Sequence, residues 1–392
     1  MRSRLSRRLL RYATAGFAVV LIAGTTACAN SSPAGLDVAR GAAADASAAI
    51  TTEVSMAAAS LETESVESPG TWLPTPVIYR GSPARISLDI TTTEAIEVET
   101  AVSLPDAATT IIGSATTQLQ PGESTITIPL NTDQSPWLDA SAPDHFNVTL
   151  NPSASGADQQ SLEIPATIAP RPVILVHGMW QDATWWDPYL GSRGFLASSN
   201  PAWKGFAVDT LDTGSPLRPL SSVNTVQQNA DLTWEYISER MRETNAHQVD
   251  VVAHSLGGVI TRRLLHDPNY GLNAQEAIHT VILLGVPDGG SPCSDTIPTP
   301  ANREITITAI TGFNEMNPGY PGVQSAALYS DHWSTTCFTA EAGDSMVPAW
   351  STTAQPTTTT QRITPGVSHP NMPKDPRLYR DFVQPLLQDP PR

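Results

Sequence analysis

The stretch that decides the fold is Val249-Asp-Val-Val-Ala-His-Ser-Leu-Gly-Gly-Val-Ile-Thr-Arg-Arg-Leu-Leu265. Its first residues, 249–253, are nearly all apolar, which is typical of a strand buried on both faces of a parallel sheet. A helix is predicted to begin directly after Ser255, so this serine lies on a tight turn. Small residues, Ala253 and Gly257, stand two positions before and after it, where larger side chains would collide with neighbouring elements. This strand–turn–helix pattern is typical of a nucleophile elbow, which exposes a serine above a sheet.

Further apolar runs flank this segment. They lie at Pro172-Val-Ile-Leu-Val-His177, 206–209 and 280–284. Between the second run and the serine strand, apolar residues recur at spacings of three and four from 223 to 241, the pattern of one helix face. Strands that alternate with helices predict a parallel sheet covered on both sides. The sequence therefore predicts an α/β domain over 170–392.

The region before this domain has a different period. Apolar and polar residues alternate in 86–90, 126–130 and 146–150, and threonine is abundant. Several short alternating strands predict a small all-β domain over 71–169, an antiparallel sandwich of immunoglobulin-like type. No cluster of residues in it indicates chemistry, so its role is open between a structural spacer and a binding module.

The N-terminus has the features of an export signal. Five arginines occur in the first eleven residues, and the apolar run that follows at 13–23 is too short for a comfortable membrane span. Small residues precede Cys28, and the segment resembles a bacterial lipoprotein signal whose cysteine becomes lipidated. We predict a signal peptide at 1–27 and a lipid anchor on Cys28 at the outer face of the cytoplasmic membrane. Ordinary secretion and an uncleaved anchor are the alternatives.

Composition separates a tether from the folded body and limits the partners. The segment at 28–70 is rich in Ala, Ser, Thr and Glu. It buries too little apolar surface to offset the entropy of ordering, which predicts a flexible tether.

The 392 residues carry a net charge of −16. This acidic balance argues against nucleic acid as a partner, because phosphate binding needs a basic face.

Several motifs in the same order make Pro172 to Leu387 similar to the α/β-hydrolase superfamily, and within it to the bacterial lipase and esterase group that contains triacylglycerol lipases. Ala253-His-Ser-Leu-Gly257 resembles the A-H-S-x-G variant of the family's nucleophile elbow. Val176-His-Gly-Met179 resembles the family's first oxyanion loop. The resemblance therefore implies an oxyanion hole made by the backbone N–H groups of Met179 and Leu256.

The catalytic residues of this family come in the order serine, acid, histidine. Ala342-Gly-Asp-Ser-Met-Val-Pro348 resembles the family's acid segment, and Gly366-Val-Ser-His369 precedes a predicted C-terminal helix, as the family's histidine does. The resemblance implies one residue for each role: Ser255 as nucleophile, His369 as base and Asp344 as orienting acid. Two alternatives stay open, namely Asp331 for the acid and His332 for the base.

Further residues are expected around the serine. Pocket candidates are aromatic residues after the oxyanion loop and an acid in a segment that resembles a lipase strand-end motif: Trp180, Trp185, Trp186 and Asp288. The aromatic side chains have a core position as their alternative. Cys293 and Cys337 flank a long insert, and in an exported chain they are expected to form a disulfide at the base of a lid or rim. Two unpaired thiols are the alternative.

These residues predict a serine hydrolase that cleaves carboxylic esters, above all lipid esters, and that needs no metal or organic cofactor. Its partners are a lipid or small ester substrate and, through the anchor, a membrane. An acyltransferase or an amidase with the same residues is an alternative. A non-catalytic surface-binding lipoprotein is the alternative from a different class. The sequence leaves the oligomeric state open.

Overall fold

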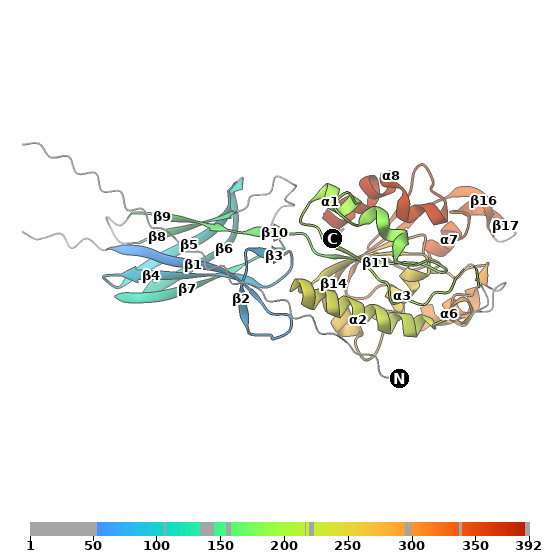
Figure 1. Cartoon of the computed structure of the whole chain (residues 1–392), viewed down its shortest axis with the longest axis horizontal. Helices are drawn as coiled ribbons and strands as arrows, with labels where there is room; N and C mark the ends of the chain where they lie inside the picture. Colours follow the sequence, from blue (N-terminus) through green and yellow to red (C-terminus); the bar gives the residue numbers. More distant parts are fainter. Residues whose placement is uncertain are drawn as a thin grey trace, which may run out of the picture. The chain divides into compact units, whose positions relative to one another are not determined.

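The structure is a computed structural model that describes residues 53–388 except 106, 134–144, 154–157, 216, 219–222, 295–298 and 337–338. The predicted signal peptide, Cys28 and Cys337 lie outside the described residues. The described chain has an N-terminal β region and a C-terminal α/β region (Figure 1). Within the described ranges, no helix is both long enough and apolar enough to cross a membrane.

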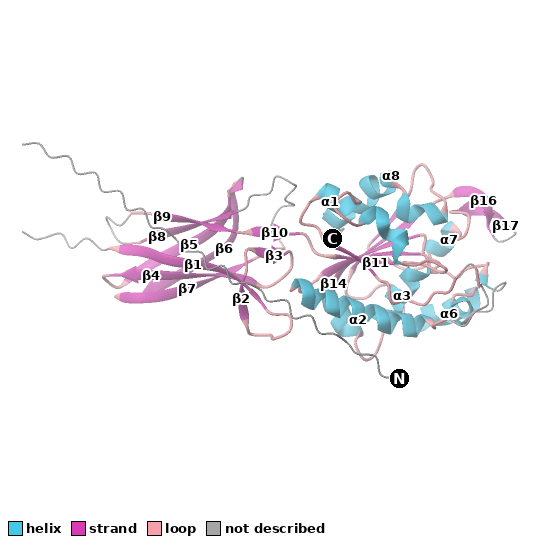
Figure 2. Ribbon diagram, viewed as in Figure 1, coloured by secondary structure: helices cyan, strands magenta, loops and turns pink. Residues whose placement is uncertain are grey.

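Two antiparallel four-stranded sheets form the β region (Figure 2). Their strand orders are β2-β1-β4-β7 and β6-β5-β8-β9. The bounds are β1 Val54–Glu64, β2 Trp72–Pro74, β4 Ala84–Thr92, β5 Ile96–Leu104, β6 Ala107–Leu119, β7 Gly122–Leu130, β8 His145–Pro152 and β9 Gln160–Pro165, and a parallel pair consists of β3 Val77–Tyr79 and β10 Thr167–Ala169. Alternate residues of both sheets pack in one core, as Ile86, Leu88 and Ile90 do. The predicted all-β region before the α/β region is confirmed.

Strand β1 corrects the predicted tether, which was expected to include this segment. Val54–Glu64 pairs with β4, and the register shifts at a β-bulge between Met56 and Ala58. Before the bulge, even-numbered positions face the core, with Val54 buried and Met56 half-buried, whereas after it odd-numbered positions such as Leu61 are buried. Because the bulge reverses the alternation and several positions hold alanine or serine, the sequence shows no period of two here.

A six-stranded parallel sheet with the order β12-β11-β13-β14-β15-β18 is the centre of the α/β region. Its strands are β11 Val173–Val176, β12 Gly205–Ala207, β13 Val249–His254, β14 Ile278–Leu284, β15 Gln324–Tyr329 and β18 Thr359–Arg362. A separate antiparallel hairpin consists of β16 His332–Thr336 and β17 Thr339–Gly343. The predicted parallel sheet is confirmed.

Helices cover the sheet (Figure 2). They are α1 Phe195–Ser199, α2 Val226–Thr244, α3 Leu256–Leu265, α4 Gly271–Ala277, α5 Pro300–Glu304, α6 Ile307–Met316, α7 Ala349–Thr352, α8 Pro376–Leu378 and α9 Gln384–Gln388, with 3-10 turns η1 Ala183–Tyr189 and η3 His369–Lys374 and a π-helical turn η4 Tyr379–Val383. Alternate residues of β13 belong to different cores, since Val251 packs with α2 and α3 whereas Val252 packs with η1 and the C-terminal helices. Both faces of the sheet are therefore buried, which explains the unbroken apolar run of β13.

Parallel strands bring their carboxyl ends to one edge of the sheet, where ligands bind in open α/β sheets. The segments that leave from this edge include the loop after β11, the turn at Ser255 after β13, the loop after β14, the segment after β15 that contains the β16–β17 hairpin and Asp344, and the loop that leads from β18 to η3. The residues that were predicted to carry chemistry lie in these segments.

Candidate active site

Ser255 lies at the sharp turn between β13 and α3. Its backbone has φ 56° and ψ −127°, and its N–H donates a hydrogen bond to the carbonyl of Leu284 at 3.0 Å. A residue other than glycine with positive φ stores strain of about 1–3 kcal/mol, which the surrounding packing must hold. A side chain at Gly257 would lie 2.5 Å from the carbonyl oxygen of Val176. Glycine is therefore required at position 257, because α3 approaches β11 closely there.

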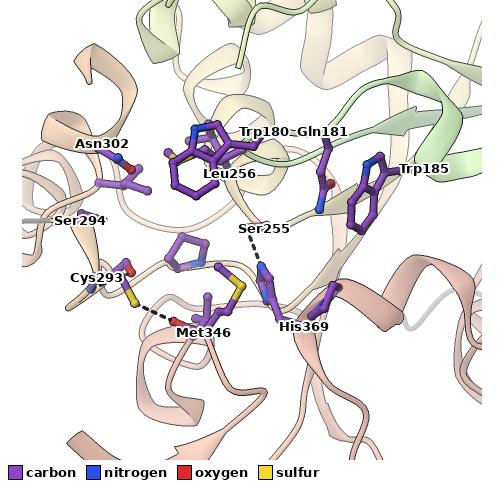
Figure 3. A pocket seen from close by; sticks show the side chains of 16 residues that line it. Trp180, Gln181, Trp185, Ser255, Leu256, Cys293, Ser294, Asn302, Met346 and His369 are labelled. Atoms are coloured by element: carbon purple, nitrogen blue, oxygen red, sulfur yellow. Dashed lines mark hydrogen bonds between the residues drawn. The ribbon is translucent and has the colours of Figure 1, made fainter. Parts of the chain in front are cut away.

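The structure brings Ser255, His369 and Asp344 together, although they are far apart in the sequence. Ser255 Oγ lies 2.8 Å from Nε2 of His369 (Figure 3). Nδ1 of His369 lies 2.6 Å from Oδ2 of Asp344. Asp344 and His369 are 2% and 4% exposed, so their pairing is shielded from water. The three side chains form one continuous hydrogen-bonded chain that begins at the elbow.

Backbone groups fix Asp344 in this position. Its Oδ1 accepts hydrogen bonds from the N–H groups of Met346 and Val347 at 3.0 and 2.7 Å. Its own carbonyl accepts the N–H of His369 at 2.7 Å. Gly285 lies beside the pair, where a side chain would collide with Oδ2 of Asp344. Backbone hydrogen bonds thus hold both Asp344 and His369 in position.

The two alternative residues lie elsewhere. Asp331 pairs with Arg362 at 2.7 Å, and both side chains are partly exposed. His332 begins strand β16 and pairs with Gly343 of β17. Neither residue lines the cavity above Ser255. The geometry therefore favours Asp344 and His369 over these alternatives.

Both residues predicted for the oxyanion hole line the same cavity as Ser255. Leu256 is the first residue of α3, so its backbone N–H has no partner within the helix. The positive end of the helix dipole adds to the attraction for a negative oxygen there. In the loop after β11, the N–H of Gly178 is occupied by Oε1 of Gln181 at 2.8 Å, whereas no acceptor among the described residues binds the N–H of Met179.

A cavity of about 240 Å³ lies above the serine. Apolar side chains dominate its wall, and Trp180 and Trp185 of the predicted pocket residues belong to it (Figure 3). The other apolar lining residues are Met179, Leu256, Pro287, Ile305, Met346, Val347 and Pro370. An apolar concave site with a few polar groups is the usual form of a small-molecule pocket.

Trp186 is not a pocket residue, which corrects the prediction. Its side chain is fully buried in the core and packs edge-to-face on Tyr189, with ring centroids 5.1 Å apart. Neighbouring residues of a 3-10 helix point about a third of a turn apart. Trp185 and Trp186 are neighbours in η1, so one ring lines the cavity and the other enters the core.

Asp288 is also wrong as a residue of the substrate rim. It is fully buried, and one carboxylate oxygen accepts the hydroxyl of Tyr320 at 2.9 Å. Its other oxygen lies 3.1 Å from Nη1 of Arg262, close enough for an ion pair although the N–H direction does not make a hydrogen bond. Burial raises the pKa of Asp288, and the charge of Arg262 opposes this shift. Asp288 belongs to a buried polar cluster behind the elbow.

Gln181 is a site residue that the sequence analysis missed. Its Oε1 accepts the N–H of Gly178 and lies 3.1 Å from Nδ1 of His254, whose Nε2 lies 3.0 Å from the carbonyl of His369. Burial lowers the pKa of His254 far below its usual value, and the charge of His369 adds to this shift. A neutral His254 has one N–H and donates it to only one of these two oxygens. A single glutamine in a loop carries no sequence signal for such a role.

Of the two cysteines that are predicted to form a disulfide, the structure describes only Cys293. Cys293 lines the cavity, and its Sγ lies 3.6 Å from the carbonyl oxygen of Met346 (Figure 3). Cys337 lies outside the described residues. The pairing of Cys293 with Cys337 therefore stays a prediction.

One protein family matches the α/β region. A model of the alpha/beta hydrolase family matches residues 173–390. A lipase of Bacillus licheniformis in its mature form is 16% identical over 56% of this chain and 92% of its own, with a TM-score of 0.44. A bromoperoxidase of Bacillus anthracis is 14% identical over 56% of this chain and 93% of its own, with a TM-score of 0.36. No curated protein matches the chain significantly. Because the family model covers more than half of its residues, the chain belongs to the alpha/beta hydrolase family.

Proposed function

We propose that this protein is a serine hydrolase that cleaves carboxylic esters with an apolar acyl group, lipid esters among them. One observation supports this proposal most strongly. It is the hydrogen-bonded chain from Ser255 through His369 to Asp344, which ends beneath an apolar cavity. A serine hydroxyl becomes an effective nucleophile only beside a base that an acid orients. This arrangement meets both requirements.

In the proposed reaction, Ser255 Oγ attacks the ester carbonyl while Nε2 of His369 takes its proton. The carbonyl π electrons move to the oxygen, which becomes a tetrahedral oxyanion. When this oxyanion collapses, the bond to the alcohol oxygen breaks, and His369 gives its proton to the leaving alcohol. Water then attacks the acyl-enzyme through the same steps and releases the acid. Asp344 holds the imidazole in the tautomer that places the lone pair at Nε2.

The oxyanion is expected to bind to the N–H groups of Met179 and Leu256. Both residues line the cavity with Ser255, and Leu256 adds the N-terminus of α3. Fixed donors of this kind stabilise charge that develops only in the transition state. The Gln181 side chain occupies the N–H of Gly178, which leaves Met179 as the donor from this loop.

The wall of the cavity favours an uncharged substrate. The lining residues include no Asp, Glu, Lys or Arg among those that the structure describes. A charged group inside this wall would lose its hydration without gaining a partner. This supports neutral esters over charged substrates, and an acyl chain that fits the volume of about 240 Å³.

Export and lipid attachment at Cys28 are part of the proposal and rest on the sequence. A lipid anchor would hold the cavity close to membrane esters. Mass spectrometry of the protein from membranes would show a diacylated N-terminal cysteine. A cleaved chain with an unmodified N-terminus would contradict the anchor and leave ordinary secretion.

The central test is labelling with a fluorophosphonate probe, together with hydrolysis of p-nitrophenyl esters. The probe should attach to the peptide that contains Ser255. Ser255→Ala should lose the label and reduce kcat by at least about a thousandfold, because the nucleophile is gone. Ser198→Ala, which changes an exposed serine of α1, serves as the matched control and should retain both.

Two results would contradict the proposal. One is a folded wild-type protein that takes no label and hydrolyses no ester. The other is a label that persists in Ser255→Ala. Assays with added acceptor alcohols would identify a transferase, since ester exchange would then outpace the release of free acid.

A further inference from the structure

The peptide group between Gly178 and Met179 carries one of the two N–H groups that are expected to bind the oxyanion. A trans peptide group is planar, and its C=O and N–H bonds point in opposite directions. Whatever holds the carbonyl of Gly178 therefore also sets the direction of the Met179 N–H. The loop lies against the nucleophile, because a side chain at Gly178 would come within 2.7 Å of Cβ of Ser255. A rotation of this peptide group would turn the donor away from the place where charge develops.

The carbonyl of Gly178 is held by a threonine from a distant segment of the chain. Oγ1 of Thr213 donates a hydrogen bond to this carbonyl at 2.9 Å. The carbonyl of Gln181 lies farther from the same hydroxyl, at 3.4 Å, so the single hydroxyl hydrogen is assigned to Gly178. Thr213 is only 2% exposed, and this hydrogen bond is therefore shielded from water.

The groups that hold this carbonyl lie away from the cavity. Besides Thr213, Nδ1 of His177 lies 3.0 Å from the carbonyl oxygen, which has two lone pairs and can accept from both groups. Neither Thr213 nor His177 lines the cavity above Ser255. The carbonyl of Gly178 is therefore directed away from the cavity. The opposite end of the peptide group, the N–H of Met179, is directed toward it.

Thr213 holds the same loop at a second point. Its carbonyl accepts the N–H of Trp180 at 3.1 Å. Trp180 has φ 59°, a left-handed conformation that strains a residue other than glycine and that the surroundings must hold. On the other side of Met179, the N–H of Gly178 is bound by Oε1 of Gln181 at 2.8 Å. Both neighbours of Met179 thus have their N–H groups fixed within the fold.

A buried asparagine of α2 fixes the segment that carries Thr213. Oδ1 of Asn229 accepts the N–H of Asp212 at 3.1 Å, and Nδ2 of Asn229 donates to the carbonyl of Asp212 at 3.2 Å. Asn229 is fully buried. Because one side-chain amide binds both backbone groups of Asp212, the chain just before Thr213 has little freedom to rotate. The hydroxyl of Thr213 therefore acts on the loop from a fixed support.

We infer that Thr213 is a positioning residue of the oxyanion hole. Its hydroxyl fixes the carbonyl of Gly178, and through the planar peptide group it directs the N–H of Met179 at the oxyanion. This inference rests on the proposed ester hydrolysis, in which Met179 and Leu256 supply the oxyanion donors. Thr213 touches no reacting atom in this arrangement, so its effect is confined to the alignment of one donor.

Two substitutions separate the hydroxyl of Thr213 from the shape of its side chain. Thr213→Val replaces the hydroxyl with a methyl group, whereas Thr213→Ser keeps the hydroxyl and removes the methyl group. Thr213→Val should lower kcat for a p-nitrophenyl ester about tenfold to a hundredfold, less than the loss of a whole oxyanion donor, with KM within about threefold of wild type. Thr213→Ser should keep kcat within about threefold of wild type, because the hydrogen bond is retained.

A pair of ketone inhibitors with the same alkyl chain tests the oxyanion itself. When Ser255 adds to a trifluoromethyl ketone, the bond from Oγ to carbon forms, the carbonyl π electrons move to the oxygen, and the proton passes to His369. The corresponding methyl ketone adds far less readily and reports binding of the neutral carbonyl. In Thr213→Val the inhibition constant of the trifluoromethyl ketone should rise about tenfold, and that of the methyl ketone should stay within about threefold. A change of packing alone would weaken both inhibitors alike.

Thr100→Val is the matched control. Thr100 is also buried, and its hydroxyl donates to the carbonyl of Ala115 at 3.1 Å. It belongs to strand β5, which contributes no residue to the cavity. The control should leave kcat and the ratio of the two inhibition constants unchanged, whatever its effect on the melting temperature. Thermal melting of each variant shows whether it is folded.

Three results would overturn the inference while fluorophosphonate labelling of Ser255 still supports ester hydrolysis. They are wild-type kcat in folded Thr213→Val, an equal loss in Thr213→Val and Thr213→Ser, and an equal weakening of both ketones. If Thr213→Val does not fold, Thr213→Ala supplies the side chain without a hydroxyl. Failure of both to fold would also overturn the inference, since the hydroxyl would then serve folding and not alignment. A wild type without label or turnover would instead count against the proposed function.

Discussion

At the scale of single residues, Asp344 has two tasks that its two oxygens divide. Oδ2 holds His369, and Oδ1 holds the backbone N–H groups of Met346 and Val347. An asparagine can retain the second task, because its amide oxygen still accepts these hydrogen bonds. It cannot hold the imidazole as a carboxylate does, so the two tasks can be separated by one substitution.

We therefore expect Asp344→Asn to fold and to lose activity. The lost carboxylate leaves the imidazole in the wrong tautomer, which in serine proteases costs about ten-thousandfold in kcat. Steady-state kinetics on p-nitrophenyl esters and thermal melting would measure the two effects. Asp331→Asn, a change of the alternative acid, is the matched control. A comparable loss in Asp331→Asn would contradict the assignment of Asp344.

The buried His254 predicts a dependence of stability on pH. Burial and the charge of His369 lower its pKa well below the ordinary 6.5, so the folded protein keeps it neutral. As the pH falls through this ordinary value, the unfolded chain takes up a proton that the folded chain refuses. The free energy of unfolding is therefore expected to fall on acidification, with a contribution of at most about 1.4 kcal/mol per pH unit.

The measurement is the melting temperature between about pH 7.5 and 5.5, within the range in which a histidine titrates. His254→Asn should show a shallower dependence than wild type. His177 and His266 also have lowered pKa values and contribute equally in both proteins. Parallel curves for the two proteins would show that His254 does not carry this effect.

At the scale of elements, α3 approaches the sheet so closely that its first turn has room only for glycine at position 257. Glycine lowers the stability of a helix interior by about 1 kcal/mol relative to alanine. Gly257 is nevertheless required, because a side chain there would meet the carbonyl oxygens of Val176 and His177 at 2.5 and 2.8 Å. Gly312 in α6 is different, since nothing lies within 4 Å of the position of its Cβ.

The same substitution should then have opposite signs at the two positions. Gly312→Ala is expected to stabilise the protein by about 0.5–1 kcal/mol through helix propensity. Gly257→Ala is expected to destabilise it by about 3 kcal/mol or more, because the backbone of β11 cannot yield cheaply. Denaturant unfolding would measure both. A neutral Gly257→Ala would mean that α3 can move away from β11 without loss.

At the scale of the whole molecule, β1 decides where the folded body begins. It lies between β2 and β4 in its sheet, and Val54 and Leu61 belong to the core of the β region. Removing it would expose both the core and the pairing edge of β4. An open edge of this kind promotes aggregation.

Two truncations test this boundary. A chain that starts at residue 53 should keep the far-ultraviolet circular dichroism signal of the β region and a cooperative melt. A chain that starts at residue 71 should lose strand signal or aggregate, because β4 has lost one of its two partners and becomes an open edge. Equal stability of the two chains would contradict the structural role of β1. It would support the predicted flexible tether over this segment instead.

Local patterns of sequence determined much of this protein. The apolar run of β13, the small residues around Ser255 and the alternation in β4 each predicted their element, because every one of these signals lies within a few neighbouring residues. The family order of serine, acid and histidine implied the three residues that the fold brings within 2.8 and 2.6 Å of each other.

Only the tertiary structure determined the features that depend on which face of a helix or strand is buried against another segment. A bulge reversed the alternation of β1, the third of a turn between neighbours in η1 separated Trp185 from Trp186, and α3 turned Arg262 toward Asp288. The physical reason is that burial and partnership are properties of contacts between distant segments, whereas the sequence displays only what lies beside each residue along the chain.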